Sequence, residues 1–532
     1  MTVWLLGDQL YPEADVLKSA DRVLLVEAHE VGDRKPYHPQ KLTYLFSAMR
    51  HARDDLHDRG HEVVYVQADT FGEGLDEYFA AEPGDDLVMQ RPPSHGAPER
   101  FRDLVTACGG SLSFVPDERF VTTPAEWDDW VGDGDGGAGD SNGAGDSNGD
   151  GDSNGDDAGD GDDATPSYRQ EHWYRHVRRK TGVLLDDGDP VGGEWNYDEE
   201  NRETPPDDWT PPSRATFEPD GITRQVTGEV ADRYGDHWGA EEPPGGFDWP
   251  VTRAQALAAL DHFVEHRLGA FGPYQDAMVE GEWALSHSLL SPAFNLGLLH
   301  PMEAVEAAEA AFGAGEAPLN SVEGFIRQLI GWREFMRHAY REAMPGLAEA
   351  NQLGQERDLP PAYWDGDTDM TCLSEAVGHV HERGYAHHIE RLMVLSNFAL
   401  VYGADPHELN EWFHLGFLDA YHWVTTPNVV GMGTFASDVV SSKPYASSGS
   451  YINRMSDYCS SCPYAVSRTT GEGACPFNAL YWDFLDEHEE TLRGTGRMGL
   501  MYSHLDDKDA VELAAIRERA TEVREQARRG EL

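Results

Sequence analysis

Short apolar runs alternate with polar or helical stretches between Val3 and about Phe114. The runs read VWLL, VLLVE, VVYVQ, DLVMQ and SLSFV, a rhythm typical of parallel strands joined by helices. One joining helix is expected after Pro-Tyr-His-Pro, because the apolar residues that follow share one helical face: Leu42, Leu45, Phe46, Met49 and Leu56. The pattern predicts an α/β, doubly wound, Rossmann-like domain over residues 1–131.

The remainder of the chain has a different pattern. Apolar residues recur at helical spacing around 257–263, 322–330 and 392–400, with Pro and Gly between these stretches. We therefore expect a large all-α domain over residues 252–505. A charged amphipathic tail is expected at 506–532.

Two connecting segments separate the predicted domains. Residues 132–165 are dominated by Gly, Asp, Ser and Asn, with GDSNG-type units that recur. A calcium-binding repeat would need apolar residues to stack its turns, so a disordered linker is expected. Residues 166–251 form an interdomain connection that holds one basic helical stretch, WYRHVRRK.

The charge is strongly negative. The 532 residues include 41 Lys+Arg and 96 Asp+Glu, a net charge of −55, which excludes a generic basic nucleic-acid-binding protein. At 39% hydrophobic and 10% aromatic residues, the chain can still build cores. We interpret the acidic excess as that of a halophile's protein, because in molar salt a Debye length of about 3 Å screens the self-repulsion. The net charge then indicates a salty habitat more than it indicates the kind of binding partner.

The N-terminal sequence MTVWLLGDQL has no basic region, and no apolar run approaches the length of a membrane span. We expect a cytoplasmic protein that has no membrane partner and acts as a monomer. Its 5 cysteines, an odd number, argue against a disulfide framework in such a chain.

Three cysteines form a compact motif. Cys459 and Cys462 stand in a Cys-Ser-Ser-Cys-Pro sequence, and Cys475 precedes another proline. Cys372 supplies a fourth ligand from a separate segment. Four thiolates suit a tetrahedral zinc ion or an iron–sulfur cluster, and the spacing leaves both open. Buried reduced cysteines are the alternative.

Three polar motifs each have a structural and a functional interpretation. Ser288 and Ser291 flank a helix that begins at a proline, where hydroxyl and backbone donors can hold a phosphate or simply cap the helix. His387 and His388 point about 100° apart, so they suit two walls of a pocket better than one metal ion. One of them can donate a proton near neutral pH, or both can be structural. The basic stretch around Arg178 is either a solvated helix face or a phosphate contact.

Ordered motifs along the chain resemble those of one known family. They include LGDQL, SAMRH, GGEWNYDEENR, HSLLSPAFNLGLLHP, YAHHIERLM, PNVVGM and ACPFNALYWDFL. Together they resemble the prokaryotic iron–sulfur photolyases and cryptochromes, also called photolyase-related proteins, a group that contains bacterial (6-4) photolyases. The resemblance covers about residues 3–505 without the linker. It implies the photolyase/cryptochrome fold, in which an antenna-binding α/β domain precedes a helical FAD-binding domain.

The resemblance also implies cofactors and their ligands. It implies a [4Fe–4S] cluster on Cys372, Cys459, Cys462 and Cys475, rather than zinc. It implies FAD with its diphosphate on Ser288 and Ser291, and with Arg391 and Asp419 beside the isoalloxazine ring. Three further residues complete the expected flavin site: Asn295, Asn428 and Met432. The antenna, 6,7-dimethyl-8-ribityllumazine in relatives, is expected near Asp8, Gln9 and Glu30.

The expected function is light-driven repair of ultraviolet-damaged DNA by a (6-4) photolyase, a lyase in which reduced FAD gives an electron to a flipped pyrimidine lesion. Trp364 and Trp412 are expected to carry electrons to the flavin, and His387 and His388 to donate the proton. The expected DNA contacts are Arg175, Arg178, Arg179, Lys180, Lys443 and Tyr445. A cryptochrome-like blue-light photosensor and a cyclobutane-dimer photolyase are the alternatives.

Overall fold

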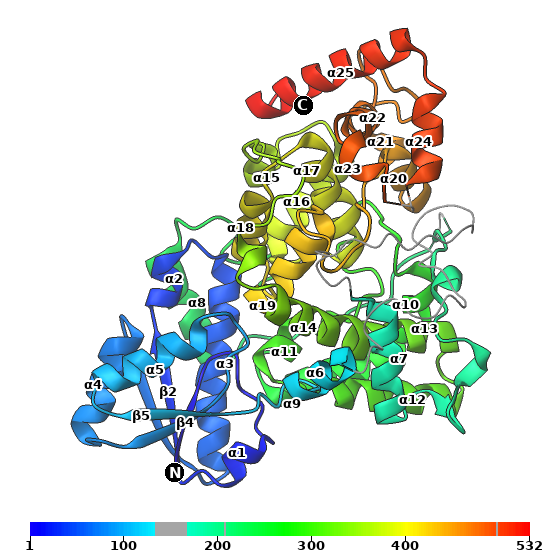
Figure 1. Cartoon of the computed structure of the whole chain (residues 1–532). Coiled ribbons are helices and arrows are strands. Elements are labelled where there is room, and N and C mark those ends of the chain that lie inside the picture. Colours follow the sequence, from blue (N-terminus) through cyan, green and yellow to red (C-terminus); the bar gives the residue numbers. More distant parts are fainter. Residues whose placement is uncertain (133–167, 207–208, 496–497) are drawn as a thin grey trace.

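The computed structural model describes residues 1–132, 168–206, 209–495 and 498–532. Figure 1 shows an α/β unit, blue at the N-terminal end, beside a larger helical part that carries the C-terminus at its far end. The linker predicted at 132–165 lies outside the described residues, except for Gly132.

The α/β unit is built on a parallel sheet of five strands in the order β3-β2-β1-β4-β5. The strands are β1 (Thr2–Leu5), β2 (Arg22–Ala28), β3 (Glu62–Ala68), β4 (Asp86–Gln90) and β5 (Ser111–Val115). The strand order reverses beside β1, as in a Rossmann-like fold. The predicted strand runs and the predicted fold class are confirmed.

Successive side chains of β1 and β2 point to opposite faces of the sheet, and both sets are mostly apolar. Val3 and Val23 belong to a core cluster with Leu42 and Phe46 of α3 (Pro39–Asp58), the helix expected after Pro-Tyr-His-Pro. Their neighbours in sequence pack on the opposite face, against α4 (Phe71–Ala81) and α5 (Ala97–Ala107). Helices on both faces bury the sheet, which explains why its strands are almost continuously apolar.

Part of the interdomain connection packs on the α/β unit. Its helix α8 (Gly221–Tyr234) lies against α3. The Arg50 guanidinium of α3 lies between them and pairs with Glu27 of β2 at 2.7 Å and with Glu229 of α8 at 2.5 Å. The connection is therefore integrated into the fold.

The larger part is helical, as predicted, and its described residues between 252 and 505 contain no strand. Its longer helices are α9 (Arg253–His266), α10 (Leu268–Tyr274), α11 (Ser291–Leu296), α12 (Pro301–Ala314), α13 (Leu319–Ile326), α14 (Glu334–Ala343), α16 (Thr371–Arg383), α17 (Asn397–Tyr402), α18 (Pro406–Gly416), α20 (Gly449–Met455), α22 (Pro476–Glu487) and α24 (Gly499–Asp506). Three short helices matter for the sites below: α15 (Ala362–Asp365), α19 (His422–Thr426) and α21 (Tyr458–Ser461).

Two hydrophobic cores divide the helical part. The first continues from the α3 face of the sheet through α9 to α14, and the second is formed by α15 to α18 with α20 to α22. The helix α25 (Ala510–Arg529) packs on α22 and buries Ile516, Ala520 and Val523. The segment predicted to be a charged tail is therefore part of the second core.

Three turns of π-helix interrupt the helical periodicity. They are η3 (Arg327–Arg333), η5 (Glu390–Ser396) and η6 (Pro427–Gly433). Such turns occur frequently at functional sites, because the extra residue changes the direction in which side chains point. Each of the three contributes residues to the cavity described below.

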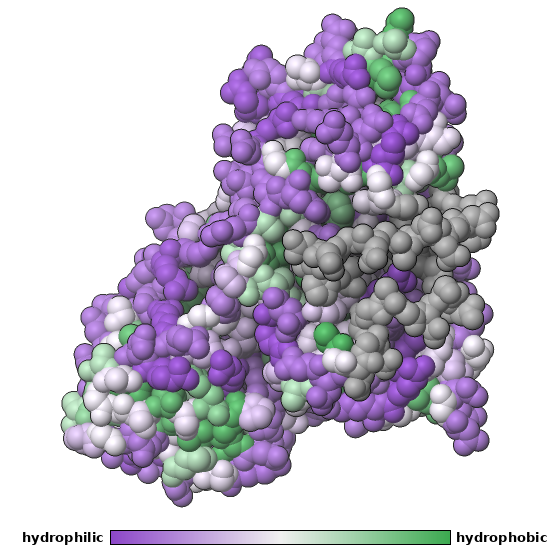
Figure 2. All heavy atoms as spheres, in the orientation of Figure 1, coloured by the Kyte–Doolittle hydropathy of each residue, from purple (hydrophilic) through white to green (hydrophobic). Residues whose placement is uncertain are grey.

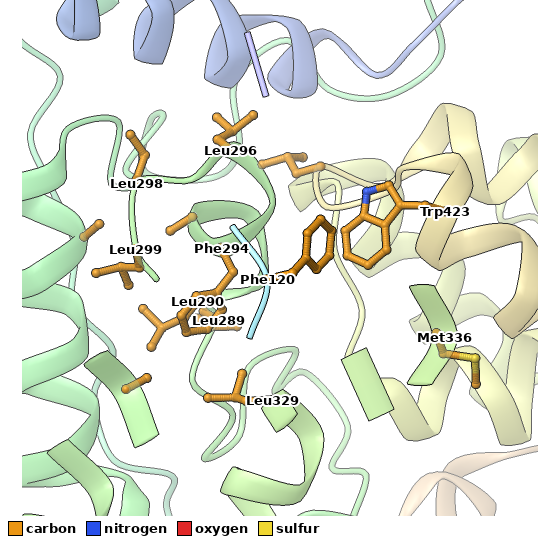
Figure 3. Close-up of a cluster of buried hydrophobic side chains, with 14 of the residues drawn as sticks. Phe120, Leu289, Leu290, Phe294, Leu296, Leu298, Leu299, Leu329, Met336 and Trp423 are labelled. Carbon is orange, nitrogen blue, oxygen red and sulfur yellow. The ribbon is translucent and has the colours of Figure 1, made fainter. Parts of the chain in front are cut away.

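An aromatic contact joins the chain after β5 to the helical part. The rings of Phe120 and Trp423 meet edge to face with centroids 4.9 Å apart, next to the leucines that surround α11 (Figure 3). The Arg333 guanidinium lies 4.4 Å from the Phe120 ring and 5.0 Å from the Trp423 ring. Trp423 belongs to α19 and Arg333 to η3, so this contact holds two elements that line the cavity.

Hydrophilic residues cover most of the face seen in Figure 2, in agreement with the net charge of −55. Among the described residues, no helix is both long enough and apolar enough to cross a membrane.

Candidate active site between the two helical cores

A cavity of about 810 Å³, the central cavity, lies where the two helical cores meet. Its lining includes Phe325 and Leu329 of the first core and Phe413 and Phe417 of the second. This volume falls near the upper end of the range for ligand pockets. The residues that the sequence predicts for the flavin all line it: Ser288, Ser291, Asn295, Arg391, Asp419, Asn428 and Met432.

A charged pair is fixed in the wall. Arg391 donates two parallel hydrogen bonds to the Asp419 carboxylate, both at 3.0 Å. Ser291 Oγ donates to the same carboxylate at 2.6 Å, and Asn295 donates to the Asp419 carbonyl at 2.8 Å. A bidentate pair of this kind is strong and directional. It presents both a donor and an acceptor at a defined place in the central cavity.

The loop that carries Ser288 has a strained backbone. Leu285 and Leu289 have φ values of 38° and 59°, in the left-handed region that branched side chains seldom adopt. The Arg267 guanidinium holds the loop by donating to the carbonyls of Ala284, Leu285 and His287. Strain of this kind is frequent where a loop is held ready for a ligand.

A flat aromatic surface forms another part of the wall. The rings of Phe413 and Phe417 lie almost parallel, with centroids 4.9 Å apart and planes 8° apart. The Arg391 guanidinium lies 4.3 Å from the Phe417 centroid. Planar aromatic and cationic groups together suit a planar conjugated ligand.

The two adjacent histidines have different environments. The His388 side chain lines the central cavity, is 46% exposed, and has Nε2 3.3 Å from Asp276 Oδ1. His387 is fully buried, and its ring stacks on His287 with centroids 4.8 Å apart. The prediction that both histidines line a pocket is therefore right only for His388, because His387 precedes the helix that begins at His388 and is buried in the core. Burial lowers the pKa of His387 and of His287 well below the ordinary value.

The two tryptophans predicted for electron transfer are joined by a third. Trp412 is fully buried and Trp364 is 39% exposed. Trp238 lies 5.7 Å from each of them between ring centroids, and its indole nitrogen donates to the Trp364 carbonyl. Sequence reasoning missed Trp238, since a single tryptophan in a connecting segment carries no signal of its own.

Some of the predicted DNA contacts line the central cavity, others are exposed outside it, and one is buried. Arg175, Lys443 and Tyr445 line the central cavity, and Arg179 is exposed outside it. The Lys180 ammonium lies 2.5 Å from a Glu126 carboxylate oxygen on α6 (Pro124–Gly132).

The prediction for Arg178 is wrong. This side chain is 1% exposed and donates to the carbonyls of Val183, Leu184 and Trp195, so it folds the segment after α7 (Gln170–Thr181) and reaches no ligand.

The predicted antenna residues follow the carboxyl ends of β1 and β2. Asp8 pairs with Arg119 at 3.2 Å, and Glu30 accepts from Arg100 at 2.9 Å. Gln9 is fully buried and donates to the Gln90 carbonyl at 2.7 Å. Its amide joins the turn after β1 to the end of β4, so Gln9 is not available as an antenna contact.

The four predicted metal-binding cysteines come together. Cys372 of α16, Cys459 of α21, Cys462 and Cys475 line one small cavity, while Cys108 lies in the α/β unit. Burial raises the thiol pKa of Cys459 to about 11 and of Cys475 to about 12. Thiols in such a site need a bound cation to become thiolates near neutral pH.

Comparisons with known proteins agree with this arrangement. The family described as deoxyribodipyrimidine photo-lyase-related protein matches residues 3–136 and 156–245. A (6-4) photolyase of Agrobacterium fabrum (strain C58) is 39% identical in an alignment of 514 residues that covers 94% of this chain and 94% of its own.

Two solved structures share the fold. A bacterial class III photolyase from Agrobacterium tumefaciens aligns over 99% of this chain and 97% of its own, with a TM-score of 0.55 and 16% identity. An archaeal photolyase from Sulfolobus tokodaii, solved with two FAD molecules, aligns over 99% of both chains, with a TM-score of 0.52 and 12% identity. The extent of the match to the Agrobacterium fabrum protein, together with this fold, shows that the chain belongs to the family of photolyase-related proteins.

Proposed function

We propose that this protein is a (6-4) DNA photolyase that uses light to repair a pyrimidine lesion flipped into the central cavity. The observation that carries the proposal is that the partly exposed imidazole of His388 and the Arg391–Asp419 pair line the same cavity. The cofactor held by the Arg391–Asp419 pair and the proton donor His388 then lie next to the same substrate. The 39% identity to a protein named (6-4) photolyase supports this substrate.

The lining of the central cavity fits FAD. Ser288 and Ser291, at the strained loop before α11, bind the diphosphate, and Asn295, Asn428 and Met432 complete the pocket. Arg391 and Asp419 hold the polar edge of the ring system, and the parallel rings of Phe413 and Phe417 contact its plane. When bound, reduced FAD supplies the electron that light transfers to the lesion. The protein binds, orients and excludes water.

His388 supplies the proton. Repair of a (6-4) lesion must return a migrated hydroxyl group, which requires proton transfer in place, and imidazole is suited to this near neutral pH. Asp276 Oδ1, 3.3 Å from Nε2, orients the ring. His387 has no exposed surface and acts behind His388.

DNA is held by a few local contacts. A lesion must leave the duplex to reach the cavity, at a cost that the damage itself lowers. Arg175, Lys443 and Tyr445 line the cavity and contact the flipped nucleotide and its phosphates, while Arg179 and Lys180 on α7 contact the flanking backbone. These contacts act against a net charge of −55, so binding depends on screening of the acidic surface by salt.

The four-cysteine site holds a [4Fe–4S] cluster. Four cysteine thiols from three segments line one small cavity, a donor set that fits such a cluster. The cluster, and not zinc, is what the family resemblance implies. Bound there, it joins α16 to the segment before α22.

Two further assignments complete the proposal. Electrons reach the flavin from the surface through Trp364, Trp238 and Trp412. An antenna, 6,7-dimethyl-8-ribityllumazine, binds at the carboxyl edge of the sheet near Asp8 and Glu30, where the strand order reverses. The protein works as a monomer in the cytoplasm of a halophile.

The test is illumination of the reduced protein with oligonucleotides that carry either a (6-4) lesion or a cyclobutane dimer, in molar salt. Restoration of bases only in the illuminated (6-4) sample is the expected result. Repair of the cyclobutane dimer alone would assign the other photolyase activity. Repair of neither lesion, with a change of oligomeric state in light, would favour a photosensor.

A further inference from the structure

A line of titratable side chains runs from the protein surface to the central cavity. Glu375, whose side chain is 29% exposed, has Oε2 3.7 Å from His379 Nε2. His379 Nδ1 lies 2.9 Å from Glu390 Oε1, and Glu390 Oε2 lies 3.6 Å from His387 Nε2. His388, next in the chain, lines the cavity. The side chains of Glu390 and His387 are fully buried.

The inner half of this line has polar atoms without hydrogen bonds. Glu390 Oε2, both ring nitrogens of His387 and His287 Nε2 are buried and unpartnered. Such atoms are rare in native interiors, because each costs the free energy of a lost hydrogen bond. Their concentration in one place points to a function that needs groups able to change partners.

The last gap in the line is short. One nitrogen each of His287, His387 and His388 lie within 4.8 Å of one another, a span that a single water molecule bridges with two hydrogen bonds. The rings of His287 and His387 are parallel within 10°. Parallel rings direct their nitrogen lone pairs side by side rather than to one point, so the three histidines suit proton exchange better than a metal ion.

We infer that Glu375, His379, Glu390 and His387 form a proton relay that keeps His388 in exchange with solvent when FAD and DNA fill the central cavity. The inference rests on the proposed flavin site. In each passage one proton enters from solvent at Glu375 and one is delivered to His388. Only O–H and N–H bonds form and break, and no electron moves along the relay.

The charges around the relay suit this role. Tyr458 donates to Glu390 Oε1 at 2.9 Å, Glu382 lies near His379, Arg391 lies near His387, and Asp276 contacts His388. The Glu390 carboxylate raises the pKa of His379, although burial opposes it.

Burial keeps His387 and His287 neutral near pH 7. A neutral imidazole has one N–H donor and one free nitrogen, and it passes a proton by taking one at one nitrogen and releasing one at the other.

Light-driven reduction of bound FAD by a one-electron donor that releases no proton when oxidised, such as ferrocyanide, tests the relay, since each FAD that gains two electrons as its reduced anion takes up one proton. Undamaged duplex DNA is added to close the cavity, and a pH-indicator dye reports proton uptake after a flash. We expect Glu390→Gln to slow uptake about tenfold or more, because the amide cannot take and release the proton. Glu375→Gln should slow it in the same direction. The exposed Glu356→Gln, outside the relay, has the same change of charge and should leave it unaltered.

Infrared difference spectra of the same samples give a second readout. The wild type should show a light-induced carboxyl band that shifts in D₂O and is absent in Glu390→Gln. Wild-type uptake rates in both Glu390→Gln and Glu375→Gln would overturn the relay. If Glu390→Gln does not fold, Glu375→Gln decides. Because no lesion is present, the result is independent of whether the protein repairs (6-4) products.

Discussion

The indole rings of Trp238 and Trp412 lie with centroids 5.7 Å apart and planes 52° apart. Trp238 lies the same distance from Trp364, which is 39% exposed. Trp412 in turn packs on Phe413, a residue of the cavity wall, at 5.4 Å. Three tryptophans therefore form a continuous row from behind the cavity wall to the surface.

Trp238→Phe should slow light-driven reduction of the flavin as strongly as Trp412→Phe does, because phenylalanine is much harder to oxidise than tryptophan. Repair by chemically reduced protein should be nearly unchanged. Transient absorption of tryptophan radicals measures the effect, and Trp482→Phe on α22 serves as the control. Unchanged radical yield in Trp238→Phe would mean that Trp364 and Trp412 exchange electrons without it.

Cys475→Ser should remove the brown absorbance of the cluster and reduce solubility, because metal ligation is coupled to folding. Iron analysis of the wild type should give about four iron atoms per chain, as a four-cysteine cubane requires. Cys108→Ser, in the α/β unit, should change neither property. Stoichiometric zinc without iron in the wild type would contradict the assignment.

Asp419→Asn should release FAD. The substitution leaves the Arg391 guanidinium without its bidentate partner, and breaking a buried pair of this kind costs on the order of 3 kcal/mol. The measurement is flavin content after gel filtration, with the exposed Asp438→Asn as the control. Full retention of FAD in Asp419→Asn would show that the pair does not face the cofactor.

Arg175→Ala and Arg178→Ala should separate DNA binding from folding. Loss of Arg175 should weaken binding of damaged duplex and reduce the slope of log affinity against log salt by about one. Loss of Arg178 should instead lower the thermal unfolding midpoint, because three backbone carbonyls lose their donor. Equal effects of both variants on the salt slope would contradict the distinction.

Local patterns predicted the strands, α3, the helical class and the cysteine site. Val3 and Val23 lie in β1 and β2 because a run of apolar residues fits a sheet buried on both faces, and that information is contained in a few neighbouring residues. The flavin-site residues were predicted from family motifs, and the structure brings all of them to one cavity.

The direction of individual side chains was not predictable in the same way. Arg178 and Arg175 belong to one basic stretch, yet one is buried under backbone carbonyls and the other lines the cavity. The periodicity of the sequence gives no sign of the π-helical turns, which depend on tertiary packing. Trp238 meets Trp364 across 126 residues of sequence, and Glu390 meets Tyr458 across 68.

Light-driven repair of a (6-4) oligonucleotide by the wild type and by His388→Ala tests the central claim most directly. Both proteins are reduced beforehand, and bound FAD and DNA affinity are verified to be equal. We expect the wild type to restore the bases in light and not in the dark, and His388→Ala to lose at least about 99% of this activity, the hundredfold effect at the lower end of the range for acid–base catalysis. Repair by His388→Ala at the wild-type rate would contradict the assignment of His388 as the proton donor.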